Sequence, residues 1–439
     1  MTAVREHSSV DEVRDALEYC YAQGWTDGLP VVPCTERLLA EFLATTDRGP
    51  DDVLLTMPHL GRSCTVRLAA LNAAMAGCRP EYFPTVVAAW RSMTTEGYAN
   101  GVMQSTTGTA PLIIVNGDVR AEIGINSAGN VFGPGFRANA TIGRAVRLGI
   151  LNVFGVRPHA LDQSTQGTPA KYTSCIGENQ EASPWPAFHE AHGFASAASA
   201  VTVLTMRSAA HIEARHTTDA EQLLRDIAGT VARTGAMMFR TSSSCLVLCP
   251  EHASLLAGQG WDRAGIGEFL FAEARVTQQQ LDAVGKGGIS RQQHWRLPRG
   301  HSDAIVDDQI GADGNLHALT SPTAVQIVVA GAANAGVSTV VDIFDLIGGA
   351  PSIVPVETAG RRFEDGPGTR LDEVVALLAR DGFTAAWDLD PDGGVTVRIG
   401  AGSADCAECL APEPVLTAIV SKALSASRFH LKRLDLPAH

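Results

Sequence analysis

Four short apolar runs separated by helical patterns constrain the fold of this chain most. The runs cover residues 112–116, 200–204, 245–249 and 325–330, and turn residues bound each run, as is typical of buried strands. Apolar residues at helical spacing occupy residues 137–148, 219–234 and 265–275. Strands that alternate with helices predict an α/β fold, here a mixed-sheet α/β core. Ligands of such sheets bind beyond the strand ends.

A change of composition predicts a second, smaller domain. Residues 354–368 are rich in Pro, Gly and charged residues, which is typical of a linker. We expect a main α/β domain over residues 1–355, with two subdomains that meet near residues 195–240 as an alternative. Residues 369–439 are expected to form a small α/β domain, with helices at 371–380 and 414–426 and strands at 385–389 and 395–399.

Composition and charge exclude several classes of protein. The chain has 439 residues, 45% of them hydrophobic, and a formal net charge of -13, which argues against broad binding to nucleic acid or anionic membranes. No apolar run has the length of a membrane span or the form of a signal peptide, so we expect a cytoplasmic protein. Nine cysteines are then expected to be reduced thiols.

The segment from Asn126 to Arg147 combines a glycine-rich loop with the start of an amphipathic helix. Gly133 and Gly135 let the backbone turn sharply, and the following helix start offers unpaired N–H groups to an anion. Arginine side chains can clamp a carboxylate or phosphate. We predict that Asn126, Arg137, Asn139, Thr141 and Arg144 bind an anionic ligand. The alternative is a tight loop leading into a buried helix, with its arginines solvated or in salt bridges.

A second polar segment, residues 162–185, contains a candidate nucleophile. Cys175 follows Lys171 by four residues and precedes Glu178 by three, and these charged groups are predicted to lower the pKa of the thiol or take its proton. The alternative is a structural cysteine packed under a loop. A histidine base is not fixed by spacing, and the nearby candidates are His189, His192, His211 and His216.

Polar turns between apolar segments supply further candidates. Cys78 and Glu81 are expected to support catalysis, and Asp27 and Arg79 to support ligand binding, because side chains in such turns can project into a cleft. We expect the loop around Pro134 and the segment around Cys175 to form two walls of one water-accessible pocket.

The pair Cys406 and Cys409 is the sharpest signal in the small domain. Two thiolates spaced by two residues at a strand-to-helix turn suit zinc, an iron–sulfur cluster or a redox dithiol, although one pair is only half of a four-thiolate site. The alternative is two unligated thiols at a helix start. Cys245 and Cys249, four residues apart on an apolar run, are interpreted as core residues.

Several motifs together resemble a known family. They are WTDGLPVVP (25–33), LNAAMAGCRPEYFP (71–84), GPGFRANATIGRA (133–145), the block from Pro169 to Trp185, and CPEHA (249–253). These motifs resemble a family of bacterial proteins associated with small UGSC-type thiol or selenol proteins. The resemblance implies an enzyme-like site and partnership with a small redox protein. The tail, through Asp392 to Gly394 and the Cys406/Cys409 pair, resembles the C-terminal domain of NifU-type iron–sulfur scaffolds.

The sequence leads to three hypotheses about function. The first is an enzyme that acts on a small anionic metabolite by thiol-dependent lyase, transferase or redox chemistry. The second is a metal or sulfur carrier that uses Cys406 and Cys409. The third is a non-catalytic, metabolite-binding subunit of a redox assembly. Homodimerisation is expected in each case, because two-fold assemblies are the commonest soluble oligomers.

Overall fold

A computed structural model describes most of the chain. The described residues are 8–93, 102–196, 198–236, 243–286, 314–343, 351–357, 371, 374–375, 378–379, 383–389, 394–400, 411–424 and 430–437. The chain divides into two compact units, Met1–Val356 and Glu357–His439. The catalytic and ligand-binding candidates above all lie in the first unit, and the cysteine pair lies in the second.

A mixed sheet forms the centre of the first unit and confirms the predicted α/β fold class. Its strand order is β4-β3-β5-β10-β6-β9, with β11 paired to β5. The strands are β3 (Ala110–Asn116), β4 (Cys175–Gly177), β5 (Ala200–Glu213), β6 (Ser243–Leu248), β9 (Val325–Val329), β10 (Val337–Ile343) and β11 (Ile353–Pro355). Two smaller hairpins are formed by β1 (Val53–Met57) with β2 (Arg62–Thr65), and by β7 (Arg275–Val276) with β8 (Leu316–His317).

The sheet repeats one arrangement of three strands. In β4-β3-β5 the middle strand comes first in the chain, runs parallel to the second and antiparallel to the third. The trio β9-β6-β10 has the same order and the same directions. The antiparallel pairing of β5 with β10 joins the two trios. Strand β5 therefore continues the sheet through residues 200–213, within the region 195–240 where a boundary between two subdomains was the alternative prediction.

The sheet curls until its outer strands approach each other. The amide of Asn179, just after β4, donates to the carbonyl of Val329 at the end of β9 at 2.7 Å, and the amide of Gly331 donates to Ser127 at 2.8 Å. The concave face encloses a core of its own, which includes Leu112, Ile114, Ile176, Leu204, Met206, Cys245, Val328 and Val341. Side chains alternate between the two faces of the sheet along each strand, so the apolar side chains on one face of each strand form this core.

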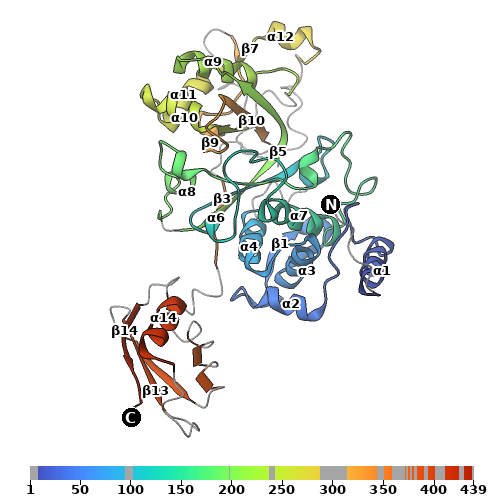
Figure 1. Cartoon of the computed structure of the whole chain (residues 1–439). Coiled ribbons are helices and arrows are strands. Elements are labelled where there is room, and N and C mark those ends of the chain that lie inside the picture. Colours follow the sequence, from blue (N-terminus) through green and yellow to red (C-terminus); the bar gives the residue numbers. More distant parts are fainter. Residues whose placement is uncertain are drawn as a thin grey trace. The chain divides into compact units, whose positions relative to one another are not determined.

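Helices cover the outer face of the sheet in two groups, and β5 runs between them (Figure 1). The first group is α3 (Val66–Ala76), α4 (Phe83–Ser92) and α7 (Arg137–Asn152), and the second is α9 (Ala220–Val231), α10 (Pro250–Gly258) and α11 (Arg263–Glu273). A Cβ atom at Gly149 of α7 would lie 2.4 Å from Cζ2 of Trp90, so glycine is needed for α7 to approach α4 this closely. Each group buries its own hydrophobic core against the sheet.

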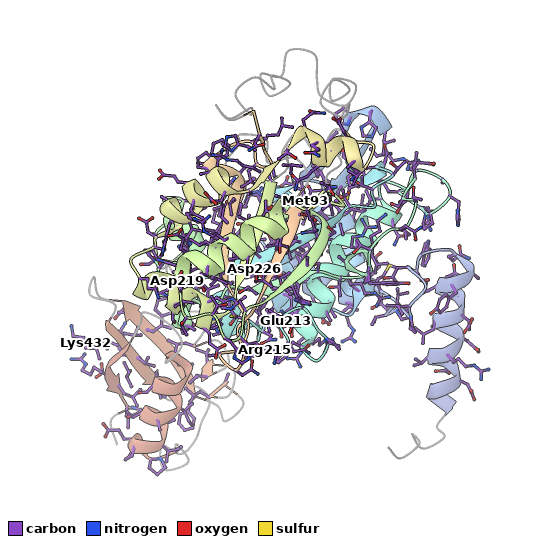
Figure 2. All side chains as sticks on the ribbon, turned by 90° about the horizontal axis from the view of Figure 1, so that it is seen from above. Met93, Glu213, Arg215, Asp219, Asp226 and Lys432 are labelled. Atoms are coloured by element: carbon purple, nitrogen blue, oxygen red, sulfur yellow. The ribbon has the colours of Figure 1, made fainter. Side chains whose placement is uncertain are left out.

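The predicted helices of the first unit are present, and polar caps fix several of their starts. Half of the residues in the helix predicted at 371–380 lie outside the described residues. Thr65 caps α3, and Asp219 caps α9 by accepting from Gln222 at 2.8 Å (Figure 2). The other α-helices of the first unit are α1 (Ser8–Ala22), α2 (Glu36–Leu43), α6 (Val119–Glu122), α8 (Phe188–Ala191) and α12 (Gln278–Ala283).

The second unit contains a three-stranded sheet and a helix. Strand β13 (Gly394–Gly400) pairs antiparallel with β12 (Thr384–Leu389) and parallel with β14 (His430–Asp435). Helix α14 (Glu413–Leu424) adds Leu416 and Val420 to a core shared with β13. Residues 401–410, which include Cys406 and Cys409, lie outside the described residues.

Candidate functional site

The two ends of the glycine-rich loop, Asn126 and Asn139, are hydrogen-bonded to each other, and Asn139 is hydrogen-bonded to Cys175. The side chain of Asn139 accepts from the amide of Asn126 at 2.8 Å and donates to the carbonyls of Asn126 and Cys175, each at 3.0 Å. All three residues are buried. The side chain of Asn126 also closes its own loop with Ala128 and Gly129. The predicted ligand amides therefore hold two backbone segments together.

The predicted anion-binding arginines are engaged within the fold. Arg144 makes a two-pronged ion pair with Asp27, at 2.8 and 2.9 Å, and also donates to the carbonyls of Leu29 and Pro30. Its side chain is only 14% exposed. The exposed Arg137 donates through Nε to the carbonyl of Gly77 at 2.9 Å. Arg144 and Asp27 were both predicted as ligand-binding residues, but they bind each other and anchor the N-terminal loop to α7.

The candidates near Cys78 divide between the surface and the core. Arg79 and Glu81 form a solvent-exposed ion pair at 3.8 Å, and exposed pairs of this kind are weak. Cys78 itself is buried, and its burial raises the pKa of the thiol to about 12, against the opposing effect of Thr141 and the nearby arginines. Thr141 also donates to the carbonyl of Arg137 at 2.8 Å within α7. This thiol is protonated at neutral pH.

The prediction that charged neighbours lower the pKa of Cys175 is wrong. Cys175 is 5% exposed, and burial raises the pKa of its thiol. Lys171 instead contacts Asp162 and Ser164, both at 2.5 Å. Since β4 places Cys175 inside the sheet, its side chain lies in the core shared with α3, α4 and α7. Spacing in the sequence did not reveal these partners.

Glu178 is a buried ion-pair residue that connects the two halves of the sheet. Its carboxylate accepts from Nδ2 of Asn116 at 2.5 Å, from the amide of Phe188 at 2.6 Å and from Arg263 at 3.0 Å. Arg263 begins α11 and lies over the ring of Trp185, 5.7 Å from its centre. Burial raises the pKa of Glu178, while these donors act against the shift. The Glu178 carboxylate therefore joins β3, α8 and α11 inside the protein.

Cys249 occupies a different environment from the other thiols. It follows β6 directly and is the N-cap residue of α10, with Pro250 at the first helical position. The sulfur therefore lies at the positive end of a helix, where a thiolate is stabilised. The strand therefore ends at Leu248, one residue before the end of the apolar run 245–249 that was predicted to form it. Cys245 is a core residue as predicted, and Cys249 is not on the strand.

Ser338 and His252 complete a polar cluster around this sulfur. The hydroxyl of Ser338 in β10 accepts from the amide of Cys249 at 3.0 Å and lies 3.7 Å from its Sγ. The same hydroxyl is 2.7 Å from Nδ1 of His252, one helical turn into α10. Cys249 and His252 are 3% and 2% exposed. The cluster is thus almost dry, and its electrostatic interactions are correspondingly strong.

The thiol and the imidazole shift each other's pKa in opposite directions. Burial opposes ionisation of Cys249, but the side chain and backbone of His252 and the hydroxyl of Ser338 lower the pKa of its thiol overall. Burial likewise opposes the charge on His252, but Cys249 and the Ala214 carbonyl raise the pKa of its imidazole overall. These shifts favour a thiolate–imidazolium pair.

A glycine makes room for this histidine. A Cβ atom at Gly336 would lie 2.7 Å from Nε2 of His252 and 3.0 Å from the carbonyl oxygen of Ala214. The turn between β9 and β10 therefore packs directly on the imidazole and holds its ring in place.

Sequence reasoning missed this cluster, although part of its signal was present. The order Cys-Pro-x-His after an apolar run places a thiol at the N-cap, proline at the first helical position and histidine at the third. Ser338 comes from a strand 89 residues further along the chain, and no local pattern connects it to Cys249.

The described residues give no support for a metal centre. Among them, no group of three or more His, Cys, Asp or Glu side chains is arranged to hold a metal ion. The cysteines they include are all free, and Cys406 and Cys409 lie outside this part of the chain.

Comparisons with protein-family models, curated proteins and solved structures find no match to this chain. Membership of the families that its motifs resemble therefore stays a prediction. In the described part of the chain, no helix is long and apolar enough to cross a membrane.

Proposed function

We propose that this chain is a thiol-dependent enzyme acting on a small anionic metabolite, with Cys249 as its reactive thiol. One observation carries the proposal. Of the seven described cysteines, Cys249 alone has a thiol pKa that is lowered, whereas burial raises the pKa of the six others: Cys20, Cys34, Cys64, Cys78, Cys175 and Cys245. The thiolate is the nucleophilic form of cysteine.

The cluster suits nucleophilic chemistry with a built-in proton carrier. In the proposed reaction the Cys249 thiolate attacks an electrophilic carbon or sulfur atom of the substrate. His252 holds the proton released by the thiol and donates it to the leaving group. Ser338 positions both groups. Lyase, transferase and redox reactions all begin from such a thiolate.

Charge and burial define the kind of substrate. The positive end of α10 and the His252 imidazolium favour an anionic reactant, which is notable in a chain with a formal net charge of -13. Since Cys249 is 3% exposed, the site favours small molecules.

Alkylation mapped by mass spectrometry tests the proposal. With iodoacetate or iodoacetamide over a range of pH, Cys249 is expected to reach its full rate near neutral pH, whereas the partly exposed Cys34 keeps accelerating into the alkaline range. The ratio of the iodoacetate rate to the iodoacetamide rate should be higher at Cys249 than at a free thiol, because iodoacetate is anionic and iodoacetamide is neutral. Cys245→Ser, which removes a core thiol four residues away, is the matched control and should leave the Cys249 profile unchanged.

Two results would contradict the proposal. One is a Cys249 that reacts only at alkaline pH, as an ordinary thiol does. The other is a failure of small carboxylates and phosphate esters to protect Cys249 from the reagent when a panel of them is screened.

A further inference from the structure

A β-bulge directs an arginine out of the regular pairing of β5 with β10. Asp342 pairs with Ser208, and the next residue of β10, Ile343, pairs with Met206. Arg207 is therefore the extra residue, and it lies just beyond the point where β3 begins to pair with β5. Bulges re-aim side chains and are over-represented next to functional sites.

Three polar residues form a row across the sheet beside this bulge. Ser208 of β5 and Ser244 of β6 both lie opposite Asp342 of β10, so the three side chains share one face. The hydroxyl of Ser208 and the guanidinium of Arg233 both donate to Oδ2 of Asp342. The hydroxyl of Ser244 is buried, and it has no hydrogen-bond partner within the described residues.

Positive charge exceeds negative charge among the described residues of this row. Arg207 donates to the carbonyl of Ala236 at 2.7 Å, but its Nε is buried without a partner in the part of the chain that the structure describes. Arg233 donates to the carbonyl of Thr230 at 2.8 Å. Within the part of the chain that the structure describes, the two guanidinium groups of this row are accompanied by one carboxylate, that of Asp342. Burial lowers the pKa of Arg207, which reflects the cost of holding this charge away from water.

We infer that Arg207, Arg233 and Ser244 bind the carboxylate or phosphate group of a small molecule. Such a group would accept from Nε of Arg207 and from the Ser244 hydroxyl, two donors that have no acceptor among the described residues, and would balance the second guanidinium. The Arg233 side chain is 28% exposed, so the row reaches the protein surface at Arg233.

This site is separate from the thiol cluster. Ser338 and Asp342 lie four residues apart on β10, about 13 Å along the strand, with the core residue Val340 between them. The inference therefore does not depend on the chemistry proposed for Cys249.

Calorimetric titration of the full chain with inorganic phosphate, and separately with malonate, in a chloride-poor buffer tests the inference. Saturable binding of at least one of these anions is expected, and the preferred anion distinguishes phosphate from carboxylate ligands. Arg207→Met should weaken binding by tenfold or more. Arg215→Met is the matched control, because Arg215 is an exposed arginine that pairs with Glu213 at 3.4 Å (Figure 2). This variant should bind as the wild type does.

Ser244→Ala keeps the inference testable should Arg207→Met fail to fold, since it removes only a hydroxyl that bonds to nothing in the described structure. A severalfold loss of affinity is expected. Absence of saturable binding in the wild type, or wild-type affinity in Ser244→Ala, would overturn the inference. Ser244→Ala should leave the pH profile of Cys249 alkylation unchanged, so a failure of the thiol proposal is distinguishable from a failure here.

Discussion

The replacement Arg263→Met tests whether Glu178 is a structural residue. This change leaves a fully buried carboxylate without its cation, and breaking a buried pair costs about 3–5 kcal/mol. The carboxylate keeps its bonds from Asn116 and Phe188, which favours the lower end of that range. Loss of the contact with Trp185 adds about 0.5–1 kcal/mol. We therefore expect a total loss of about 4 kcal/mol in the free energy of unfolding.

Arg225→Met is a closely matched control. Arg225 also pairs with glutamates and lies over an aromatic ring, that of Phe269 at 5.6 Å, but its side chain is 53% exposed. Exposed pairs are screened by water and salt, so a far smaller loss is expected. Urea unfolding of the full-length variants, followed by tryptophan fluorescence, measures both changes.

The double variant Glu178→Gln/Arg263→Met separates charge from packing. Glutamine retains an oxygen for the Asn116 and Phe188 donors but removes the unpaired negative charge, so part of the lost stability should return. The structural role of Glu178 would be refuted if Arg263→Met cost no more than Arg225→Met. It would also be refuted if the double variant were no more stable than Arg263→Met alone.

Two further predictions concern the thiol cluster and the response to acid. Gly336→Ala should cost about 1–3 kcal/mol in thermal unfolding and raise the pKa of Cys249, because the new methyl group would lie 2.7 Å from Nε2 of His252; Gly258→Ala in α10, with nothing within 4 Å, should show neither effect. Asp162 is buried, but Lys171 and Ser164 lower its pKa overall, so its contribution to stability is present at neutral pH and is lost as the pH falls through the folded-state pKa. Asp162→Asn should therefore flatten the acid side of a plot of urea midpoint against pH, and an unchanged slope would contradict this reasoning.

The sequence predicted strands well where their side chains are uniformly apolar, and helices well where apolar residues recur at helical spacing. Strands β3, β6 and β9 and helix α7 lie where the apolar patterns placed them. Strand β10 was missed, because Ser338, Thr339 and Asp342 interrupt its apolar pattern. Two of these polar residues belong to the two proposed sites. Ser338 contacts Cys249, and Asp342 pairs with Arg233.

The candidate site was predicted less well, because long-range pairing decides the environment of a charged side chain. Arg144 and Asp27 are 117 residues apart in the sequence, and the ion pair between them decides that neither is free for a ligand. Lys171 lies four residues from Cys175, but it contacts Asp162 and Ser164 instead. Proximity in the sequence therefore gave the wrong partner for the thiol.

The charge state of Cys249 is the central claim, and ultraviolet titration measures it directly. Thiolates absorb near 240 nm, so the difference in absorbance between the wild type and Cys249→Ser, followed from acid to alkaline pH, isolates this one sulfur without requiring a reagent to reach it. The difference signal is expected to appear below the pH at which a free cysteine ionises, and His252→Asn is expected to move it to higher pH. A signal that appears only at the pH of a free cysteine or above, and that His252→Asn leaves in place, would contradict the account.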